Sequence, residues 1–277
     1  MNPIQDYRDF YANYIVRSEG SSNQELIAAF ATVQREHFVG KGPWPISVGS
    51  GYMTTISDDP RLLYQDILVG LATDRGINNG QPSLHARCIS ACEPRSGESV
   101  VHIGAGTGYY TAILATLVGV SGSVAAYEIE NDLADRARSN LSHLPNVTVL
   151  NASATEVPVP MADVIYVNAG ATHPPPSWLD ALNLGGRLVF PLTPNDGPGC
   201  MLMVTRLGDT RYAASAIMRV AFIPCVGARD DASSKTLAVA LGAQSHNTVR
   251  SLRRGTPPDN SAWCVGKDWW LSTSEAE

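Results

Sequence analysis

The chain has 277 residues, enough for one large or two small domains with a sizeable hydrophobic core. Its contents of 44% hydrophobic and 17% charged residues are ordinary for a globular protein and exclude a largely disordered one. The net charge of -6 at pH 7 argues against a broad phosphate-binding surface, so we expect no nucleic-acid partner.

The beginning of the chain carries no targeting signal that we can recognise. Residues 1–20 lack both a basic start and an uninterrupted apolar core, and no stretch elsewhere reaches about eighteen apolar residues. We therefore expect a cytoplasmic protein that does not enter a membrane. The five cysteines are scattered and odd in number, which favours reduced thiols and no metal site. They are Cys88, Cys92, Cys200, Cys225 and Cys264.

The first third of the chain is predicted to be mostly helical. Ser22 and Glu25 have the spacing of a capping box, and Pro82 suits the first turn of a helix. Apolar residues recur at helical spacing in the segments that follow these signals. The predicted helices are 4–15, 26–33, 60–72 and 82–92. We interpret residues 1–97 as an N-terminal helical segment on the substrate side.

From residue 98 the pattern changes to short β-branched runs that alternate with helical stretches. The predicted strands are 99–104, 123–129, 146–151, 162–170 and 185–192, and the predicted helices between them are 111–119, 132–141 and 175–183. This alternation predicts an α/β fold with a Rossmann-like, doubly wound, mostly parallel sheet over residues 98–225. Residues 201–207 and 214–224 are predicted to form an antiparallel pair at the sheet edge. Residues 226–277 are a C-terminal extension with few signals.

A glycine-rich turn follows the first of these strands. Gly104, Gly106 and Gly108 are spaced G-x-G-x-G, whereas a dinucleotide-binding turn would have its third glycine at the position of Tyr109. Tyr109 at that position disfavours NAD. No Gly-Lys-Ser or Gly-Lys-Thr follows the turn, which disfavours ATP. Glu128 ends the next strand, where its carboxylate could accept two hydrogen bonds from ribose hydroxyls. Strand, glycine triplet, helix, strand and acid in this order resemble the class I methyltransferases that bind S-adenosylmethionine.

Longer stretches resemble the protein-L-isoaspartate O-methyltransferases. The segment 81–119, with its Gln-Pro, helix and glycine strand, is similar to that family, as are "VQREHFV" at 33–39 and the segment 162–192. The likeness runs from about residue 5 to 225. It implies an enzyme that uses S-adenosylmethionine to methylate an oxygen, with a carboxylate of a peptide or small metabolite as the acceptor.

The resemblance also implies a set of cofactor-binding residues. His102 occupies the position of an acid that helps to hold the methionine ammonium in many class I methyltransferases, and Ser153 that of an Asp facing the adenine amine. Asn168 ends the fourth strand, where polar side chains reach the ligand, and we expect Tyr109 to cover the cofactor or acceptor. The predicted cofactor-binding residues are Gly104, Ala105, Gly106, Thr107, Gly108, Tyr109, Glu128, Ile129, Ser153, Ala154 and Asn168.

One departure from the family concerns the acceptor. The family has Thr-Ile-Ser directly before its Gln-Pro, with the hydroxyl at the substrate, whereas this chain has Asn78, Asn79 and Gly80 there. We predict that the substrate contacts Asn79, Gln81 and Ser83. Retention of isoaspartyl repair is left open.

The acceptor decides whether a catalytic base is needed. A carboxylate is already ionised and needs only positioning, whereas a phenol or amine must lose a proton. The candidate bases are His173, which follows the fourth strand at the carboxyl end of the sheet, and His85 on the helix 82–92. Methylation of a phenol or amine and an adaptor that binds the cofactor without turnover remain alternatives, as does a homodimer. A nucleotide-dependent oxidoreductase is disfavoured by Tyr109.

Overall fold

The computed structural model describes residues 3–49 and 51–276. The predicted segments 1–97 and 226–277 also contain four residues outside the described part, which are Met1, Asn2, Ser50 and Glu277. The described residues form two compact units. The first comprises residues 1–98 and 105–151, and the second comprises residues 99–104 and 152–277. The functional division at residues 97/98 and 225/226 stays a prediction.

The first unit contains the N-terminal helices and two helices that follow strands. They are α1 (Pro3–Ser18), α2 (Gln24–Thr32), α3 (Glu36–Val39), α4 (Pro82–Cys92), α5 (Tyr109–Val118) and α6 (Asn131–Leu141). The cap of α2 is Asn23, whose side chain accepts from the Leu26 amide over 3.0 Å, so the predicted cap at Ser22 is wrong by one residue. Pro82 begins α4 as predicted.

The strands of the first unit form three pairs. The pairs are β1 (Pro45–Ser47) with β2 (Tyr52–Thr54) and β3 (Gly70–Ala72) with β4 (Ile77–Asn78), both antiparallel, and β6 (Ser123–Glu128) with β7 (Val147–Asn151), which is parallel. Two short 3-10 helices lie between these strands along the chain: η1 (Pro60–Leu63) between β2 and β3, and η2 (Thr73–Arg75) between β3 and β4.

The helix predicted over residues 60–72 is wrong, because only η1 and β3 are regular there. The guanidinium of the buried Arg35 donates to the carbonyls of Leu63, Gln65 and Ile67, at 2.6, 3.0 and 2.6 Å. A helix would use these carbonyls for its own backbone hydrogen bonds. The distant arginine therefore stabilises an irregular segment whose sequence pattern is apolar and helical.

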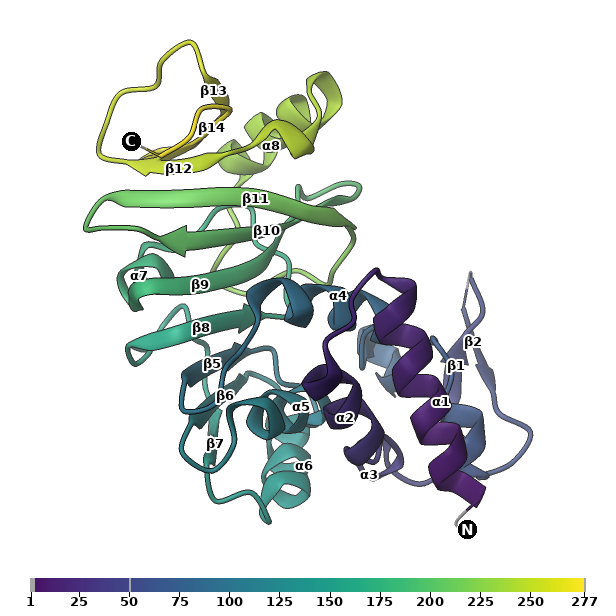
Figure 1. The fold of residues 1–277 in the computed structure, drawn as a ribbon. Coiled ribbons are helices and arrows are strands. Elements are labelled where there is room, and N and C mark those ends of the chain that lie inside the picture. The colour runs from purple at the N-terminus through teal and green to yellow at the C-terminus, as the bar shows by residue number, and fades with distance from the viewer. Residues whose placement is uncertain (1–2, 50, 277) are drawn as a thin grey trace. The chain divides into compact units, whose positions relative to one another are not determined.

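The second unit is built on a mixed sheet, whose strands β8 to β12 lie side by side in Figure 1. Its strands are β5 (Ser99–Ile103), β8 (Ala162–Val167), β9 (Leu182–Leu192), β10 (Gly199–Arg206), β11 (Arg211–Val220), β12 (Ser251–Arg254), β13 (Ala262–Val265) and β14 (Trp269–Ser272). Its helices are α7 (Pro176–Asp180), α8 (Asp231–Ala243) and the 3-10 helix η3 (His246–Thr248). Within this unit the order is β13-β14-β12-β11-β10-β9-β8-β5.

The parallel strands of the prediction are present, but the antiparallel part is larger than expected. β5, β8 and β9 pair in parallel, whereas every pair from β9 outwards is antiparallel. The predicted pair β10–β11 exists but does not lie at the edge, because Tyr212 of β11 pairs with Leu252 of β12. The extension adds strands because its apolar side chains, such as Leu252, Leu271 and Trp270, become buried.

No helix in the described part of the chain is long and apolar enough to cross a membrane.

Candidate functional site

The glycine turn has a backbone that only glycine adopts easily. Gly104, Gly106 and Gly108 have φ values of +77, +56 and +98°. A Cβ at Gly108 would lie 2.7 Å from Leu141 Cδ1, so a side chain there would require Leu141 to move. At Gly106 the nearest atom would be Leu71 Cδ1 at 3.4 Å, an ordinary margin for a flexible side chain. An added Cβ would therefore make no clash at Gly106, and the same holds at Gly104, where the nearest atoms of Asn168 would lie at 3.4 Å.

Glu128, at the end of β6, is tied to this turn. Its Oε2 accepts from the Gly106 amide over 2.6 Å, and its Oε1 accepts from the Glu130 amide over 3.0 Å. The residue is only 6% exposed, and burial raises its pKa while the two backbone donors oppose that rise. Each carboxylate oxygen has further acceptor capacity, so two hydroxyls can still be bound. The predicted acid is thus fixed beside the predicted turn.

Two residues that the sequence reading missed hold the loop after β6. Asn151 Nδ2 donates to the carbonyls of Glu128 and Ile129, at 2.9 and 3.2 Å. Arg75 forms ion pairs with Glu130 and with Asp132, the latter at 2.7 Å. Ile129 itself is 44% exposed, as suits a residue predicted to contact a ligand. Asn151 ends a predicted strand, and this position was the available signal for it.

In the second unit, the half-buried Asn168 and the buried His102 form a polar pair. Asn168 Nδ2 lies 2.8 Å from His102 Nε2. Burial lowers the pKa of His102 to about 3, so the ring is neutral and Nε2 accepts this hydrogen bond. Asn168 Oδ1 is buried, and no described residue donates to it. A Cβ on Gly104 would lie 3.4 Å from the Asn168 Cβ, so this unpaired acceptor belongs to a side chain beside the first glycine of the turn.

Ser153 and Ala154 lie in the turn after β7. The Ser153 hydroxyl is 2.7 Å from Thr155 Oγ1, and the Ala154 carbonyl accepts from Trp178 Nε1 over 3.0 Å. Both residues are part of a hydrogen-bonded turn, and their contact with a cofactor stays a prediction. The Ser153 hydroxyl retains the capacity to accept a second hydrogen bond.

Tyr109 and His85 occupy the interior of the first unit. Tyr109 is 2% exposed and its ring contacts Phe30 and Phe38, so its side chain packs in the interior. The predicted cover over a ligand stays a prediction. His85 is 1% exposed and stacks on Tyr110 with ring centroids 3.7 Å apart. A base must reach the proton it abstracts, and the role of this buried histidine as a base stays a prediction.

Two of the three predicted substrate residues lie around Asp66, a residue that the sequence did not single out. Its carboxylate accepts from Gln81 Nε2, from the Ser83 amide and from the Ser83 hydroxyl, each over 2.8 Å. Asn79 is buried, and its Oδ1 accepts from the Val69 amide and from Arg35. Gln81 and Ser83 are therefore brought together, whereas the Asn79 side chain supports the loop from within.

His173 is paired with a carboxylate from the start of α8. His173 Nδ1 lies 3.1 Å from Asp230 Oδ2 and 3.2 Å from Thr172 Oγ1, which in turn accepts from the Asp230 amide over 2.9 Å. Burial lowers the pKa of His173, and the Asp230 charge partly opposes this shift. The other oxygen of Asp230 caps α8 through the Ser233 amide at 2.7 Å. A neutral imidazole that donates from Nδ1 to Asp230 leaves Nε2 as an acceptor.

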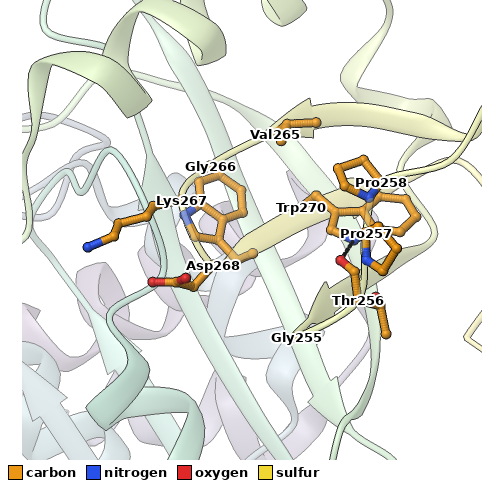
Figure 2. Close-up of a pocket in the computed structure, with 10 residues that line it drawn as sticks. Gly255, Thr256, Pro257, Pro258, Val265, Gly266, Lys267, Asp268 and Trp270 are labelled. Atoms are coloured by element: carbon orange, nitrogen blue, oxygen red, sulfur yellow. Dashed lines mark hydrogen bonds between the residues drawn. The ribbon is translucent and has the colours of Figure 1, made fainter.

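The C-terminal extension has a pocket of about 330 Å³ between the loop after β12 and the hairpin of β13 and β14. Figure 2 shows Trp270 beside Pro257 and Pro258, while Lys267 and Asp268 point away from the two prolines. Trp270 Nε1 donates to the Thr256 carbonyl over 3.0 Å. The three tryptophans of the extension, Trp263, Trp269 and Trp270, are buried.

The arginines of the extension interact within the chain. Arg254 forms an ion pair with Asp180 at 2.6 Å, and the Arg253 guanidinium lies 5.2 Å from the ring centre of Trp270. All five cysteines are buried, and all have free thiols. The described residues contain no group of three or more His, Cys, Asp and Glu side chains that could hold a metal ion.

Comparison with known proteins gives a consistent family. The family model described as Protein-L-isoaspartate(D-aspartate) O-methyltransferase (PCMT) matches residues 14–230. A Protein-L-isoaspartate O-methyltransferase of Methanoculleus marisnigri is 29% identical over 230 residues, which cover 82% of this chain and 94% of that protein. Protein-L-isoaspartate O-methyltransferase 2 of Pelobacter propionicus is 31% identical over 232 residues, which cover 81% and 92%.

Solved structures agree in fold. A structure named protein-L-isoaspartate O-methyltransferase aligns with a TM-score of 0.66 at 23% identity, covering 84% of this chain and 69% of that one. A putative protein-L-isoaspartate O-methyltransferase of Plasmodium falciparum, in complex with S-adenosyl-L-homocysteine, aligns with a TM-score of 0.64 at 18% identity, covering 79% and 98%. At these identities the likeness shows the fold, and it confirms the predicted α/β, Rossmann-like class.

Proposed function

The chain belongs to the Protein-L-isoaspartate(D-aspartate) O-methyltransferase family, and from this premise we propose that it methylates a carboxylate of an isoaspartyl-type peptide or a small metabolite. It is an S-adenosylmethionine-dependent methyltransferase. The observation that carries the proposal is the buried carboxylate of Glu128, the last residue of β6. It accepts a hydrogen bond from the Gly106 amide. This acid can bind the two hydroxyls of a ribose.

Each unit, taken by itself, has residues that fit one part of such a cofactor. In the first unit, a Cβ at Gly106 would meet only Leu71 Cδ1 within 4 Å, and the Gly106 amide donates to the Glu128 carboxylate. In the second unit, Asn168 Oδ1 is a buried acceptor without a donor, which suits the ammonium group of a methionine moiety. We propose that Asn168 takes over the task of the family acid at position 102, since the buried, neutral His102 cannot attract a cation.

The remaining predicted cofactor contacts stay part of the proposal. They are Gly104, Ala105, Thr107, Gly108, Tyr109, Ile129, Ser153 and Ala154. For Tyr109 we propose a contact through the backbone, because its side chain is packed among Phe30 and Phe38. When bound, S-adenosylmethionine supplies an electrophilic methyl group on a positively charged sulfur.

A carboxylate acceptor needs little chemistry from the chain. It is ionised at neutral pH, so positioning at the methyl carbon supplies most of the acceleration. We propose that Gln81 and Ser83 position the acceptor peptide, with Asp66 fixing both side chains. Asn79 supports this loop from within through its bonds to Val69 and Arg35.

A second candidate, methylation of a phenol or amine, is favoured by one observation. His173 is held by Asp230 at 3.1 Å in the geometry of a general base, which a carboxylate acceptor does not need. We keep this alternative because the Thr-Ile-Ser triplet of the family is replaced by Asn78, Asn79 and Gly80. The cytoplasmic location and the lack of a nucleic-acid partner stay predictions from the sequence.

The proposal is tested by incubating the protein with methyl-labelled S-adenosylmethionine and three acceptors. These are a peptide with one isoaspartyl residue, the same peptide with normal aspartate, and a small dicarboxylic acid. We expect label on the isoaspartyl peptide or on the small acid, released as methanol by mild base because it is an ester. Base-stable label on a phenol or amine would establish the second candidate. Cofactor binding with no transfer to any acceptor, including those in a cell extract, would indicate an adaptor.

A further inference from the structure

Helix α1 exposes aromatic side chains on the side that faces away from the first unit's core. Tyr7, Phe10 and Tyr14 are 47, 73 and 53% exposed, whereas Tyr11 and Ile15 of the same helix are buried. The buried side packs on α2, which lies beside α1 in Figure 1. Exposing three aromatic rings on one helix is costly, and exposed apolar patches of this kind mark interaction sites.

These rings are held in place before any partner binds. The rings of Phe10 and Tyr14 are parallel to within 2° with centroids 6.2 Å apart. The Arg61 guanidinium lies 5.8 Å from the centre of the Tyr7 ring, and Arg61 itself forms an ion pair with Asp59. A preordered surface loses less conformational entropy on binding than a mobile one.

Two charges without ion-pair partners flank the rings. Asp6 lies near the beginning of α1 and Arg17 near its end, and neither forms an ion pair with another described residue. They are eleven residues apart, which is about three helical turns, so both project from the same side of the helix. We call Asp6, Tyr7, Phe10, Tyr14 and Arg17 the α1 face.

We propose that the α1 face binds a second copy of the chain, with the two α1 helices antiparallel across a two-fold axis. In this arrangement Asp6 lies opposite the partner's Arg17, and Tyr7 lies opposite the partner's Tyr14. Both pairs are centred within one residue of position 11, so a single axis satisfies them together. Such self-complementarity is what an isologous contact requires. The antiparallel orientation also places opposite helix dipole ends side by side.

The contact is smaller than that of an obligate dimer, because one four-turn helix from each copy supplies most of it. We therefore expect reversible dimers with a dissociation constant on the order of 1 to 100 μM. This inference does not depend on the proposed methyl acceptor, and sedimentation measures it without any substrate.

The test is sedimentation velocity of the full chain over a concentration series, with charge-reversal variants. Wild type should dimerise, and Asp6→Lys or Arg17→Glu should each weaken self-association at least tenfold, because both Asp6–Arg17 contacts become repulsive. An equimolar mixture of the two variants should form heterodimers, in which both contacts are attractive again. The double variant Asp6→Lys/Arg17→Glu should also recover dimerisation.

Matched controls separate this effect from general changes of the surface. Glu156→Lys reverses an exposed charge outside the α1 face, and Leu184→Asp alters a side chain as exposed as Phe10; both should leave the dimer unchanged. Phe10→Asp should abolish it, while circular dichroism confirms that α1 is folded. A monomeric wild type at 200 μM (roughly twice the weakest expected constant) would overturn the proposal. Failure of the two singly reversed variants to associate with each other would overturn it as well, because it would exclude the antiparallel pairing of Asp6 with Arg17.

Discussion

The carboxylate of Glu128 and the backbone amide of Gly106 are joined by a hydrogen bond of 2.6 Å, although 22 residues separate them in the chain. The bond links the end of β6 to the glycine turn, so the acid and the turn keep their relative position before a ligand arrives. Preorganisation of this kind reduces the entropy that binding must offset.

Replacing Glu128 with Gln should weaken binding of S-adenosylhomocysteine by about 1.5 to 3 kcal/mol, the range for hydrogen bonds to a charged group. The amide retains one acceptor oxygen but loses the charge and one acceptor, so the ribose is bound less well. Isothermal titration calorimetry measures the change. Glu130→Gln is the matched control, because its side chain pairs with Arg75 while its backbone amide still reaches Glu128. Equal dissociation constants for wild type and Glu128→Gln would remove Glu128 from the ribose site.

Replacing Gly106 with Ala should reduce cofactor binding more than it reduces stability. The new Cβ would meet only Leu71 Cδ1 at 3.4 Å, and the positive φ of +56° costs about 1 kcal/mol for alanine. Space that the ligand needs is lost in addition. Thermal unfolding and calorimetry on the same sample compare the two effects.

Gly185→Ala provides the control for backbone strain. Its φ is +80° and nothing lies within 4 Å of its Cβ position, so it should lower the melting temperature without affecting the ligand. If Gly106→Ala bound the cofactor as tightly as Gly185→Ala, the turn would be structural only.

Much of the fold could be predicted because its signals are local. The strands β5, β6, β7 and β8 each consist of one short apolar run, and Pro82 begins α4 where its missing amide costs nothing. Residues 60–72 could not be predicted in this way, since their conformation depends on hydrogen bonds from Arg35, some thirty residues earlier. A long-range donor to backbone carbonyls leaves no periodic pattern in the segment that it holds.

The residues of the candidate site, too, could be predicted only where the sequence signal is local. Glu128 was identifiable because an acid at a strand end has a fixed place after a glycine turn. The partner of His173 was not, because Asp230 reaches it only after the chain returns from β11 and the Cys225 amide bonds to the Gly170 carbonyl at 2.8 Å. The burial of His85 beneath Tyr110 likewise depends on how α4 packs against α5.

Replacing His173 with Gln distinguishes the two acceptor classes. With a carboxylate acceptor we expect kcat to change by less than about threefold, whereas loss of a general base from a phenol or amine reaction costs about 100- to 10,000-fold. Single-turnover rates with each acceptor from the labelling experiment provide the measurement.

Asp230→Asn adds a pH test of the same pair. Removing this charge lowers the pKa of His173 further, since Asp230 opposes the lowering caused by burial. With a proton-bearing acceptor the acidic limb of the rate profile should therefore shift to lower pH, whereas a carboxylate acceptor should show no shift of this limb. A large loss of kcat in the His173→Gln variant with an isoaspartyl peptide would contradict the proposal that a carboxylate acceptor needs only to be positioned.

His102 should make the second unit sensitive to acid. Burial lowers its pKa to about 3 in the folded state, against about 6.5 when unfolded, so the unfolded chain binds more protons between these values. The stability that this histidine contributes is present above about pH 6.5 and is lost as the pH falls towards 3. Between pH 7 and pH 5 the loss is about 2 kcal/mol of unfolding free energy.

In His102→Gln this part of the pH dependence should disappear, even if the variant is less stable at every pH. Urea unfolding followed by tryptophan fluorescence measures it, because four of the five tryptophans lie in the second unit. His143→Gln, at an exposed position, is the control, and an unchanged slope in His102→Gln would show that the imidazole is not neutral when buried.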